Sequence, residues 1–251
     1  MFNPRVVVRN DDRFYEWEGR LYPSVTTIIA NTMPRQALHH WREREIVKAM
    51  IAAISRSKSI HEAIASARAA AAAPDSISRR AAREGTAAHL RLSRYLMGVS
   101  PAISDADKNG IVFLEKEGLV PVAVEYPFVD AEKRYAGTID LIASNGSENV
   151  IVDWKTGSPK DEHAIQLAAY ADAIERITGT AISRCCAVYL SKQGAIVQDV
   201  KRGEALEIWS LLLRLYEMRL FSLFEDKDRV YSAAGEKPTR LKIIKELQSS
   251  S

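Results

Sequence analysis

The stretch from Gly137 to Tyr170 reads GTIDLIASNGSENVIVDWKTGSPKDEHAIQLAAY. Two apolar runs in it are joined by Ser-Asn-Gly-Ser, and Asn-Gly between apolar runs is a strong signal for a β-hairpin turn. Each run carries one aspartate, Asp140 in the first and Asp153 in the second. Pairing the runs as a hairpin brings the two carboxylates side by side, although they are 13 residues apart (153 − 140 = 13).

Lys155 follows Asp153 by two residues, so alternation along a strand places both side chains on one face and Trp154 on the other. An isolated Asp-x-Lys pattern is more often a surface salt bridge. Here, however, the acids interrupt apolar strands, and burying unpaired acids costs on the order of several kcal/mol. Adjacent carboxylates favour a hard cation, so the sequence predicts a site for Mg²⁺ or Mn²⁺. A lysine beside that ion can orient a water or stabilise developing phosphate charge.

Three ordered motifs resemble those of the PD-(D/E)XK nucleases, specifically the RecB-like branch with its phage-type and mitochondrial single-strand exonucleases. They are Gly137-Thr-Ile-Asp140, Asp153-Trp-Lys155 and Gln166-Leu-Ala-Ala-Tyr170. The resemblance covers about residues 20 to 220 and is firmest over 84 to 170. It implies an α/β fold, in which a mixed central sheet flanked by helices forms a restriction-endonuclease-like core with an α-helical N-terminal elaboration.

The resemblance also implies the roles of the central residues. It makes His89, Asp140, Asp153 and the backbone carbonyl of Trp154 the metal ligands, and Lys155 the residue that positions or activates the water. His89 enters only through the pattern Gly85-Thr86-x-x-His89 on a helix ahead of the sheet, whereas a lone helical histidine is usually structural. A neutral imidazole suits Mn²⁺ better than Mg²⁺.

Three further residues have supporting roles by the same analogy. Glu125 lies inside an expected strand. By the family analogy it is an acid near the metal cluster or one that supports Gln166 and Tyr170; the alternative is an edge-strand acid paired with a lysine. Gln166 and Tyr170 are four residues apart and share a helix face. They lie either near the scissile phosphate or bases, or at an amphipathic boundary with Tyr170 half-buried.

The N-terminal segment Pro23-Ser24-Val25-Thr26-Thr27-Ile28, followed by Pro34, Leu38 and Trp41, is typical of the start of the phage-type and mitochondrial exonucleases. On that reading the hydroxyls of Ser24, Thr26 and Thr27 contact phosphate oxygens. The alternative is a β-branched strand that enters a helix capped by Ser24 or Thr26.

We expect residues 1–251 to form one nuclease domain: a mainly helical N-terminal elaboration (1–118), an α/β catalytic core (119–225) and a polar C-terminal tail (226–251). A small β region is expected within 5–30. The expected helices are 36–54, 59–73, one after Pro74 capped by Asp75 or Ser76, 108–117 after a loop at 98–107, 162–177, 204–224 and a short one at 239–247. The expected strands are 120–129, 135–143, 150–155, 182–190 and 194–200.

Composition narrows the class of protein. A net charge of +3 and a pI of about 8.8 permit a polyanionic partner. The only cysteines, Cys185 and Cys186, are neighbours that would point to opposite faces of a strand, which argues against a disulfide or shared metal site. We therefore expect no iron–sulfur cluster, unlike the related CRISPR-associated nucleases with four cysteines. Without a run of about 20 apolar residues or a signal-peptide core, the expected location is cytoplasmic, with no membrane contact.

The function expected from these motifs is metal-dependent hydrolysis of DNA phosphodiesters, as an exonuclease acting on DNA ends or single strands. The alternatives are an endonuclease or junction resolvase on the same core, and a non-enzymatic nucleic-acid-binding protein with a relic site. Against a relic, no member of the Asp140, Asp153 and Lys155 trio is missing. No Gly-rich P-loop occurs, so helicase activity would require a helicase or recombination partner chain.

Overall fold

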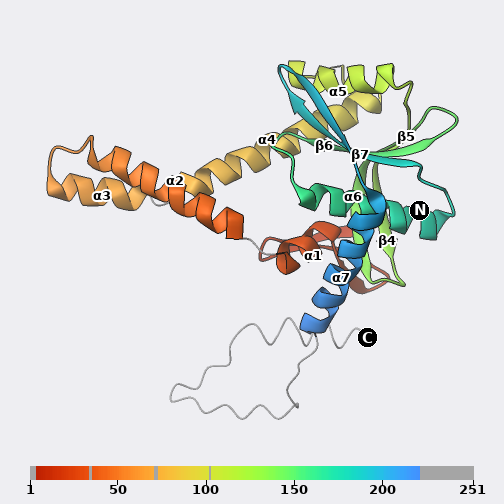
Figure 1. Ribbon diagram of the computed structural model, residues 1–251, viewed down its shortest axis with the longest axis horizontal. Coiled ribbons are helices and arrows are strands. Elements are labelled where there is room, and N and C mark those ends of the chain that lie inside the picture. The colour runs from red at the N-terminus through yellow and green to blue at the C-terminus, as the bar shows by residue number, and fades with distance from the viewer. Residues whose placement is uncertain (1–3, 34–35, 71–72, 102, 221–251) are drawn as a thin grey trace, which may run out of the picture.

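A computed structural model describes residues 4–33, 36–70, 73–101 and 103–220 (Figure 1). The described chain forms a three-stranded sheet of order β1-β2-β3, a five-stranded sheet of order β4-β5-β6-β7-β8, and helices α1 to α7. The strands are β1 (Arg5–Arg9), β2 (Asp12–Trp17), β3 (Arg20–Pro23), β4 (Val120–Asp130), β5 (Tyr135–Ser144), β6 (Asn149–Lys155), β7 (Arg184–Ser191) and β8 (Gly194–Asp199). The helices are α1 (Val25–Thr32), α2 (Gln36–Ile54), α3 (Ile60–Ala70), α4 (Ala73–Leu96), α5 (Asp105–Lys116), α6 (Asp161–Thr178) and α7 (Arg202–Leu220).

The five-stranded sheet is mixed, as predicted. Strands β4, β5 and β6 pair antiparallel, β6 and β7 pair parallel, and β7 and β8 pair antiparallel. The expected hairpin is the β5–β6 connection, and α6 is the crossover that a parallel pair requires. The predicted order of helix, three strands, helix and strand is therefore confirmed.

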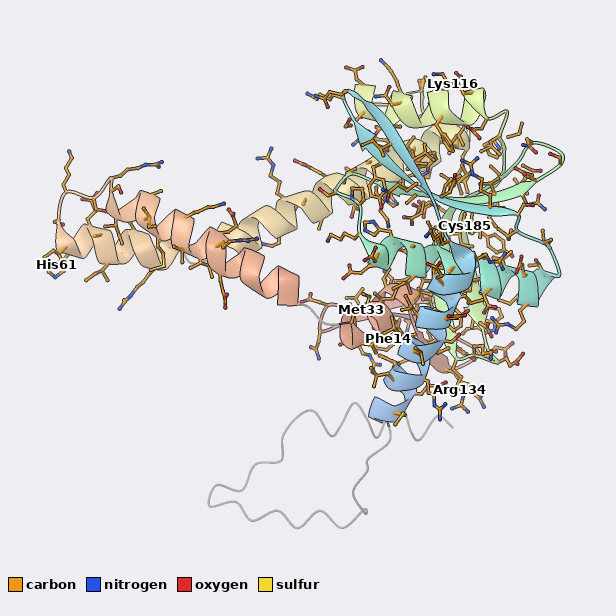
Figure 2. All side chains as sticks on the ribbon, viewed as in Figure 1. Phe14, Met33, His61, Lys116, Arg134 and Cys185 are labelled. Atoms are coloured by element: carbon orange, nitrogen blue, oxygen red, sulfur yellow. The ribbon has the colours of Figure 1, made fainter. Side chains whose placement is uncertain are left out.

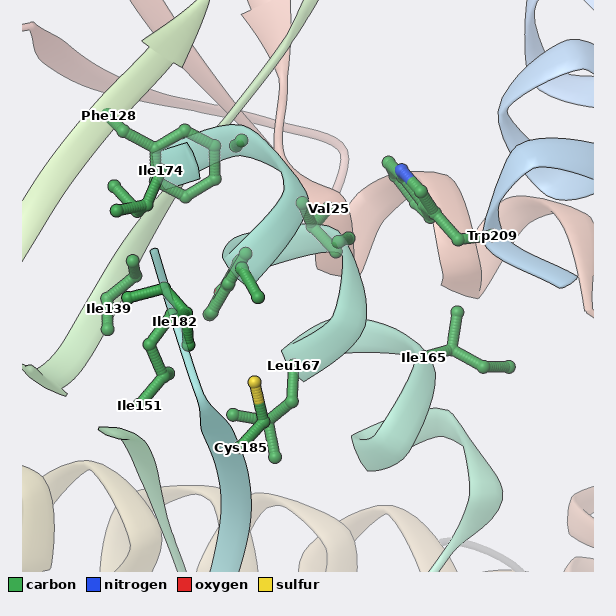
Figure 3. Close-up of a cluster of buried hydrophobic side chains, with 14 of the residues drawn as sticks. Val25, Phe128, Ile139, Ile151, Ile165, Leu167, Ile174, Ile182, Cys185 and Trp209 are labelled. Atoms are coloured by element: carbon green, nitrogen blue, oxygen red, sulfur yellow. The ribbon is translucent and has the colours of Figure 1, made fainter. Parts of the chain in front are cut away.

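Helices cover both faces of this sheet. On one face, α1 and α6 pack on the strands and α7 packs on these two helices. Val25, Leu167 and Trp209 belong to the same apolar cluster as Ile139 and Ile151 (Figure 3). On the other face, α5 and the C-terminal part of α4 cover a second apolar cluster, formed by Leu92, Phe113, Leu114, Leu119, Leu141, Ala143, Val150, Val152, Trp154, Cys186, Val188 and Leu190.

Strand alternation decides which residues reach which face. Ile151 lies in the first cluster and Trp154 in the second, which places Asp153 and Lys155 on the α6 side. The prediction that these two residues share one face and Trp154 the other is confirmed. Cys185 and Cys186 likewise divide between the two clusters, and both are free and buried.

The small N-terminal sheet packs on β4 and β5. Tyr15 and Tyr22 form an apolar cluster with Val129 and Ala136, and the Tyr15 hydroxyl lies 2.8 Å from Thr138 Oγ1. The chain then enters α1, whose first turn is capped by Ser24. The predicted β region is confirmed for residues 5–23 and the predicted Ser24 cap is confirmed, but the β-branched segment after Ser24 forms α1 and not a strand.

An arm made of α2, α3 and the first part of α4 extends away from the sheets (Figure 1). Helices α2 and α3 pack against each other, and His61 lies at the tip of the arm (Figure 2). The predicted caps Asp75 and Ser76 are wrong, because α4 begins at Ala73 and both residues lie inside its first turn. Since α4 continues to Leu96, one helix joins the arm to the sheet.

The main boundary error concerns α5, which begins at Asp105 and not at residue 108. Ser104 accepts a hydrogen bond from the backbone of Asp107, whose carboxylate accepts from the Ser104 backbone, so a capping box starts the helix early. Most remaining boundaries shift by one or two residues. The predicted end of the last long helix (221–224), the predicted tail and the short helix predicted at 239–247 lie outside the described residues. None of the helices described here combines the length and apolarity needed to cross a membrane.

Candidate active site

Three acids line up across neighbouring strands of the five-stranded sheet. The pair Leu141–Val152, continued by one residue, sets Asp140 opposite Asp153. On the other side of β5, the pairs Val124–Leu141 and Tyr126–Ile139 bracket Glu125 opposite Asp140. The sheet register therefore gathers the acids that the sequence predicted for the site.

Asp140 joins three elements. Its Oδ2 accepts a hydrogen bond of 2.9 Å from the backbone N–H of Trp154 on β6, and its Oδ1 lies 3.1 Å from His89 Nδ1 on α4. The side chain is nearly buried, with an exposed fraction of 8% for the residue. The predicted proximity of His89 to the aspartates is thus present in the fold.

Asp153 and Lys155 form a buried ion pair, with Lys155 Nζ 2.6 Å from Asp153 Oδ2. Gln166 on α6 bridges them, because its Nε2 donates to Asp153 Oδ1 over 3.1 Å and its Oε1 accepts from Lys155 Nζ over 3.2 Å. Burial, followed by the charge of Asp140, raises the pKa of Asp153, while Lys155 and His89 act in the opposite direction. Burial lowers the pKa of Lys155, but the pairing with Asp153 prevails and raises it.

Tyr170 completes this network by accepting a hydrogen bond of 3.0 Å from Gln166 Nε2. Its ring is buried and packs edge-on against Phe128, with the centroids 5.5 Å apart. A Cβ atom at Gly137 would lie 2.8 Å from the Tyr170 ring and 2.7 Å from the Phe128 ring. Because the glycine of the Gly-x-x-Asp motif has no side chain, both rings can pack directly against its backbone.

His89, Glu125 and Asp140 form a group that can hold a cation. One ligand atom from each residue lies within 4.8 Å of the other two. Burial, then the charge of Asp140, raises the pKa of Glu125, so two acids are held together against their repulsion. Carboxylate oxygens with one imidazole nitrogen suit a divalent ion such as Mg²⁺ or Mn²⁺, so the residues present fit the expected cofactor.

Comparison with protein families agrees with this geometry. A family model described as the PD-(D/E)XK nuclease superfamily matches residues 36–247. This chain belongs to the PD-(D/E)XK nuclease superfamily. A search of curated proteins gave no match. Membership implies a divalent-metal nuclease with DNA as the substrate class, on the restriction-endonuclease-like α/β core that the sequence predicted.

Within this PD-(D/E)XK site, Asp153 lies beside the three-residue cation group and not inside it. It contacts Lys155 and Gln166, yet its charge raises the pKa of His89, so the two sets of side chains are close. The ligand role of Asp153 and of the Trp154 carbonyl remains a prediction, and Glu125 takes a more central position than its supporting role implied.

The hydroxyl groups of Ser24 and Thr27 are buried, and both form hydrogen bonds within the protein. Ser24 Oγ accepts from the backbone N–H of Thr27 over 3.0 Å, and Thr27 Oγ1 donates to the Arg13 carbonyl over 3.1 Å. Thr26 alone of the three predicted phosphate contacts is exposed, and its Oγ1 lies 2.9 Å from Ser24 Oγ. The predicted phosphate contact therefore remains a prediction, with Thr26 as its accessible member.

The sequence reasoning missed two residues beside Lys155. His163 Nδ1 on α6 lies 2.8 Å from the hydroxyl of Tyr189 on β7, and Tyr189 pairs with Lys155 in the parallel register. The sequence could have indicated His163, because this residue precedes Gln166 by three positions and shares a helix face with Gln166 and Tyr170. The pairing of β6 with β7, which brings in Tyr189, is a tertiary feature.

Proposed function

We propose that this protein is a divalent-metal-dependent deoxyribonuclease of the RecB-like branch, which acts as an exonuclease on DNA ends or single strands. One observation carries the proposal: the fold brings His89, Glu125 and Asp140 within ligand reach of a single point, next to the buried Asp153–Lys155 pair. A cation group beside a buried lysine is what metal-assisted hydrolysis of a phosphodiester requires.

His89, Glu125 and Asp140 would hold the ion, with Asp153 as the adjacent acid. The bound ion supplies Lewis-acid polarisation of a phosphoryl oxygen and lowers the pKa of a bound water. His89 binds only in its neutral form, so its proton must leave first. Burial and Lys155 favour loss of this proton, whereas Asp140 and Asp153 oppose it.

Lys155 has the role of orienting the attacking water or offsetting charge on the phosphate. A protonated lysine has three donors and no lone pair, so it cannot be a metal ligand or a base in that state. Asp153 and Gln166 fix the position of the ammonium group. Tyr170 in turn fixes Gln166, so the packing at Gly137 supports the position of Lys155.

The preference for an exonuclease rests on the N-terminal segment from Pro23 to Ile28, which has the pattern of the phage-type and mitochondrial exonucleases. The pattern Gly85-Thr86-x-x-His89, whose histidine contacts Asp140, supports the RecB-like branch. Gly85 lies close to the end of β6, since a Cβ atom there would be 3.4 Å from Thr156 Oγ1.

The test is to incubate end-labelled linear DNA, single- and double-stranded, and closed circular DNA with Mg²⁺ or Mn²⁺. Asp153→Asn and a chelator serve as controls. We expect metal-dependent loss of the linear strands, intact circles and no activity in either control. Cleavage of single-stranded circles would assign an endonuclease. DNA binding without cleavage under any divalent ion would reject the nuclease assignment.

A further inference from the structure

The His163–Tyr189 pair lies next to Lys155 but has no part in the catalytic role proposed above. His163 is partly exposed on α6, one turn before Gln166. Side chains three residues apart on a helix have Cβ atoms about 5–6 Å apart. His163 is therefore placed one step further along the substrate-facing side of α6 than the residue that holds Lys155.

The Tyr189 hydroxyl orients the imidazole, because it lies 2.8 Å from His163 Nδ1. With the phenolic O–H as the donor to Nδ1, a neutral imidazole carries its own hydrogen on Nε2. Burial, then the charges of Lys155 and Lys160, lowers the pKa of His163 to about 4, which keeps the ring neutral.

Nε2–H has no hydrogen-bond acceptor among the described residues, and the same part of the chain offers no ion-pair partner for the Lys160 ammonium group. Lys160 is exposed and precedes α6 directly, three residues before His163. The adjacent acids Asp161 and Glu162 lie in the first turn of α6, where they complement the helix dipole. A neutral N–H donor and an ammonium group on one side of Lys155 form a recognition pair for an anionic oxygen.

We propose that His163 Nε2–H and the Lys160 ammonium group bind a backbone phosphate of the DNA strand, adjacent to the phosphate at Lys155, with Tyr189 as the positioning residue. The proposal rests on the proposed function, because the strand bound here is the substrate. It adds a subsite that fixes the strand one phosphate away from the cut. Since His163 is neutral, it contributes directional hydrogen bonding, whereas Lys160 contributes charge.

The test is a methylphosphonate scan in Ca²⁺, which lets binding be measured by fluorescence anisotropy apart from cleavage. Each phosphate of a labelled single-stranded oligonucleotide is replaced in turn by the neutral methylphosphonate. We expect one linkage to weaken binding to the wild type by about tenfold or more, as for a hydrogen bond to a charged group. His163→Leu and Lys160→Met should bind the unmodified strand more weakly and show little further loss at that linkage.

Matched variants separate recognition from folding. His163→Gln places an amide N–H near the position of Nε2 and should restore part of the binding. Tyr189→Phe removes the hydroxyl that orients the imidazole. The methylphosphonate at the contacted linkage should therefore reduce the affinity of this variant less than it reduces that of the wild type. Lys116→Met, on α5 at the opposite face (Figure 2), should behave as the wild type.

The outcomes separate the two proposals. The subsite is wrong if His163→Leu and Lys160→Met retain the wild-type binding profile at every linkage, or if they lose affinity equally at all linkages. Metal-dependent cleavage would in that case still support the nuclease assignment. A position-specific loss without cleavage would support the subsite and reject the nuclease. Lys160 is exposed, so its substitution tests the subsite even if His163→Leu fails to fold.

Discussion

His89 Nδ1 on α4 lies 3.1 Å from Asp140 Oδ1 on β5, although 51 residues separate them in sequence (140 − 89 = 51). Burial alone would lower the pKa of the imidazole. The hydrogen bond to Asp140 and the charges of Asp140 and Asp153 together exceed that effect and raise the pKa to about 9. Without metal, His89 is therefore a cation at neutral pH, and the proton occupies the position that an ion would take.

The first prediction concerns the pH dependence of stability without metal. The pKa of His89 is about 9 in the folded chain and 6.5 when unperturbed, so its stabilising contribution is complete below pH 6.5 and is lost as the pH rises through 9. We expect the free energy of unfolding, measured by urea denaturation with a chelator, to fall over this window. His89→Gln should lose that slope. Equal slopes in both proteins would contradict the ion pair.

The second prediction concerns Lys155→Met. The variant should keep its affinity for Mn²⁺, because the lysine is not a ligand, and lose turnover by about a hundredfold or more. It also leaves the buried Asp153 without its cation, which should cost about 3 kcal/mol of metal-free stability. Calorimetry for Mn²⁺ binding, single-turnover cleavage and thermal unfolding measure the three effects.

Metal should then rescue the stability of Lys155→Met. A divalent ion restores a positive charge beside Asp153, so added Mn²⁺ should raise the melting temperature of the variant more than that of the wild type. Asp153→Asn is the control, since the amide needs no cation. A loss of Mn²⁺ affinity in Lys155→Met as large as in Asp153→Asn would contradict the proposed role of the lysine.

Local signals predicted the parts of the site that depend on neighbours in sequence. The Asn-Gly turn and the alternation of β5 and β6 placed Asp140 beside Asp153 and turned Trp154 to the other face. The early start of α5 was also readable, because Ser104 and Asp107 have the spacing of a capping box.

The remaining parts depend on packing between distant elements, or on a backbone irregularity. The contact of His89 with Asp140 requires α4 to pack against β4 and β6, the neighbours of β5, and only family resemblance indicated it. Tyr189 meets His163 because β7 pairs with β6, which no local pattern encodes. Glu125 reaches the cation group from a strand position whose φ angle of 49° breaks the expected alternation.

The third prediction concerns Gly137→Ala. The new methyl group would meet the rings of Phe128 and Tyr170 at 2.7 and 2.8 Å, and both rings are buried. We expect a loss of about 1–3 kcal/mol in stability, as for overpacking of a core. Movement of Tyr170 should also disturb Gln166, so turnover should fall more than metal affinity does. Chemical denaturation and cleavage kinetics test both parts.

Gly203→Ala is the matched control for this substitution. Gly203 lies in α7, and a Cβ atom there would meet nothing within 4 Å. Because Gly203 is exposed in the first turn of α7, alanine there should change stability by less than about 0.5 kcal/mol and leave cleavage unchanged. If Gly137→Ala behaves in the same way, the packing of Tyr170 against this glycine is not what holds the site together.

The last prediction concerns the backbone at Glu125. A φ angle of 49° is in the left-handed region, which costs a residue with a Cβ atom about 1–2 kcal/mol relative to glycine. Burial and the charge of Asp140 also oppose ionisation of this carboxylate. The fold therefore holds a strained, repelled acid within ligand reach of His89 and Asp140.

If that strain serves cation binding, stability and metal affinity should separate. Glu125→Gly should be more stable than Glu125→Ala by about 1 kcal/mol, since only the glycine relieves the backbone. Both should bind Mn²⁺ at least about tenfold more weakly than the wild type. Glu125→Gln keeps the size and backbone of the native residue and removes only the charge, so its affinity isolates the carboxylate. Calorimetry measures the Mn²⁺ affinity of the three variants, and urea denaturation measures their stability. An amide is a far weaker ligand for a divalent ion than a carboxylate. Wild-type Mn²⁺ affinity in Glu125→Gln would therefore exclude Glu125 as a ligand.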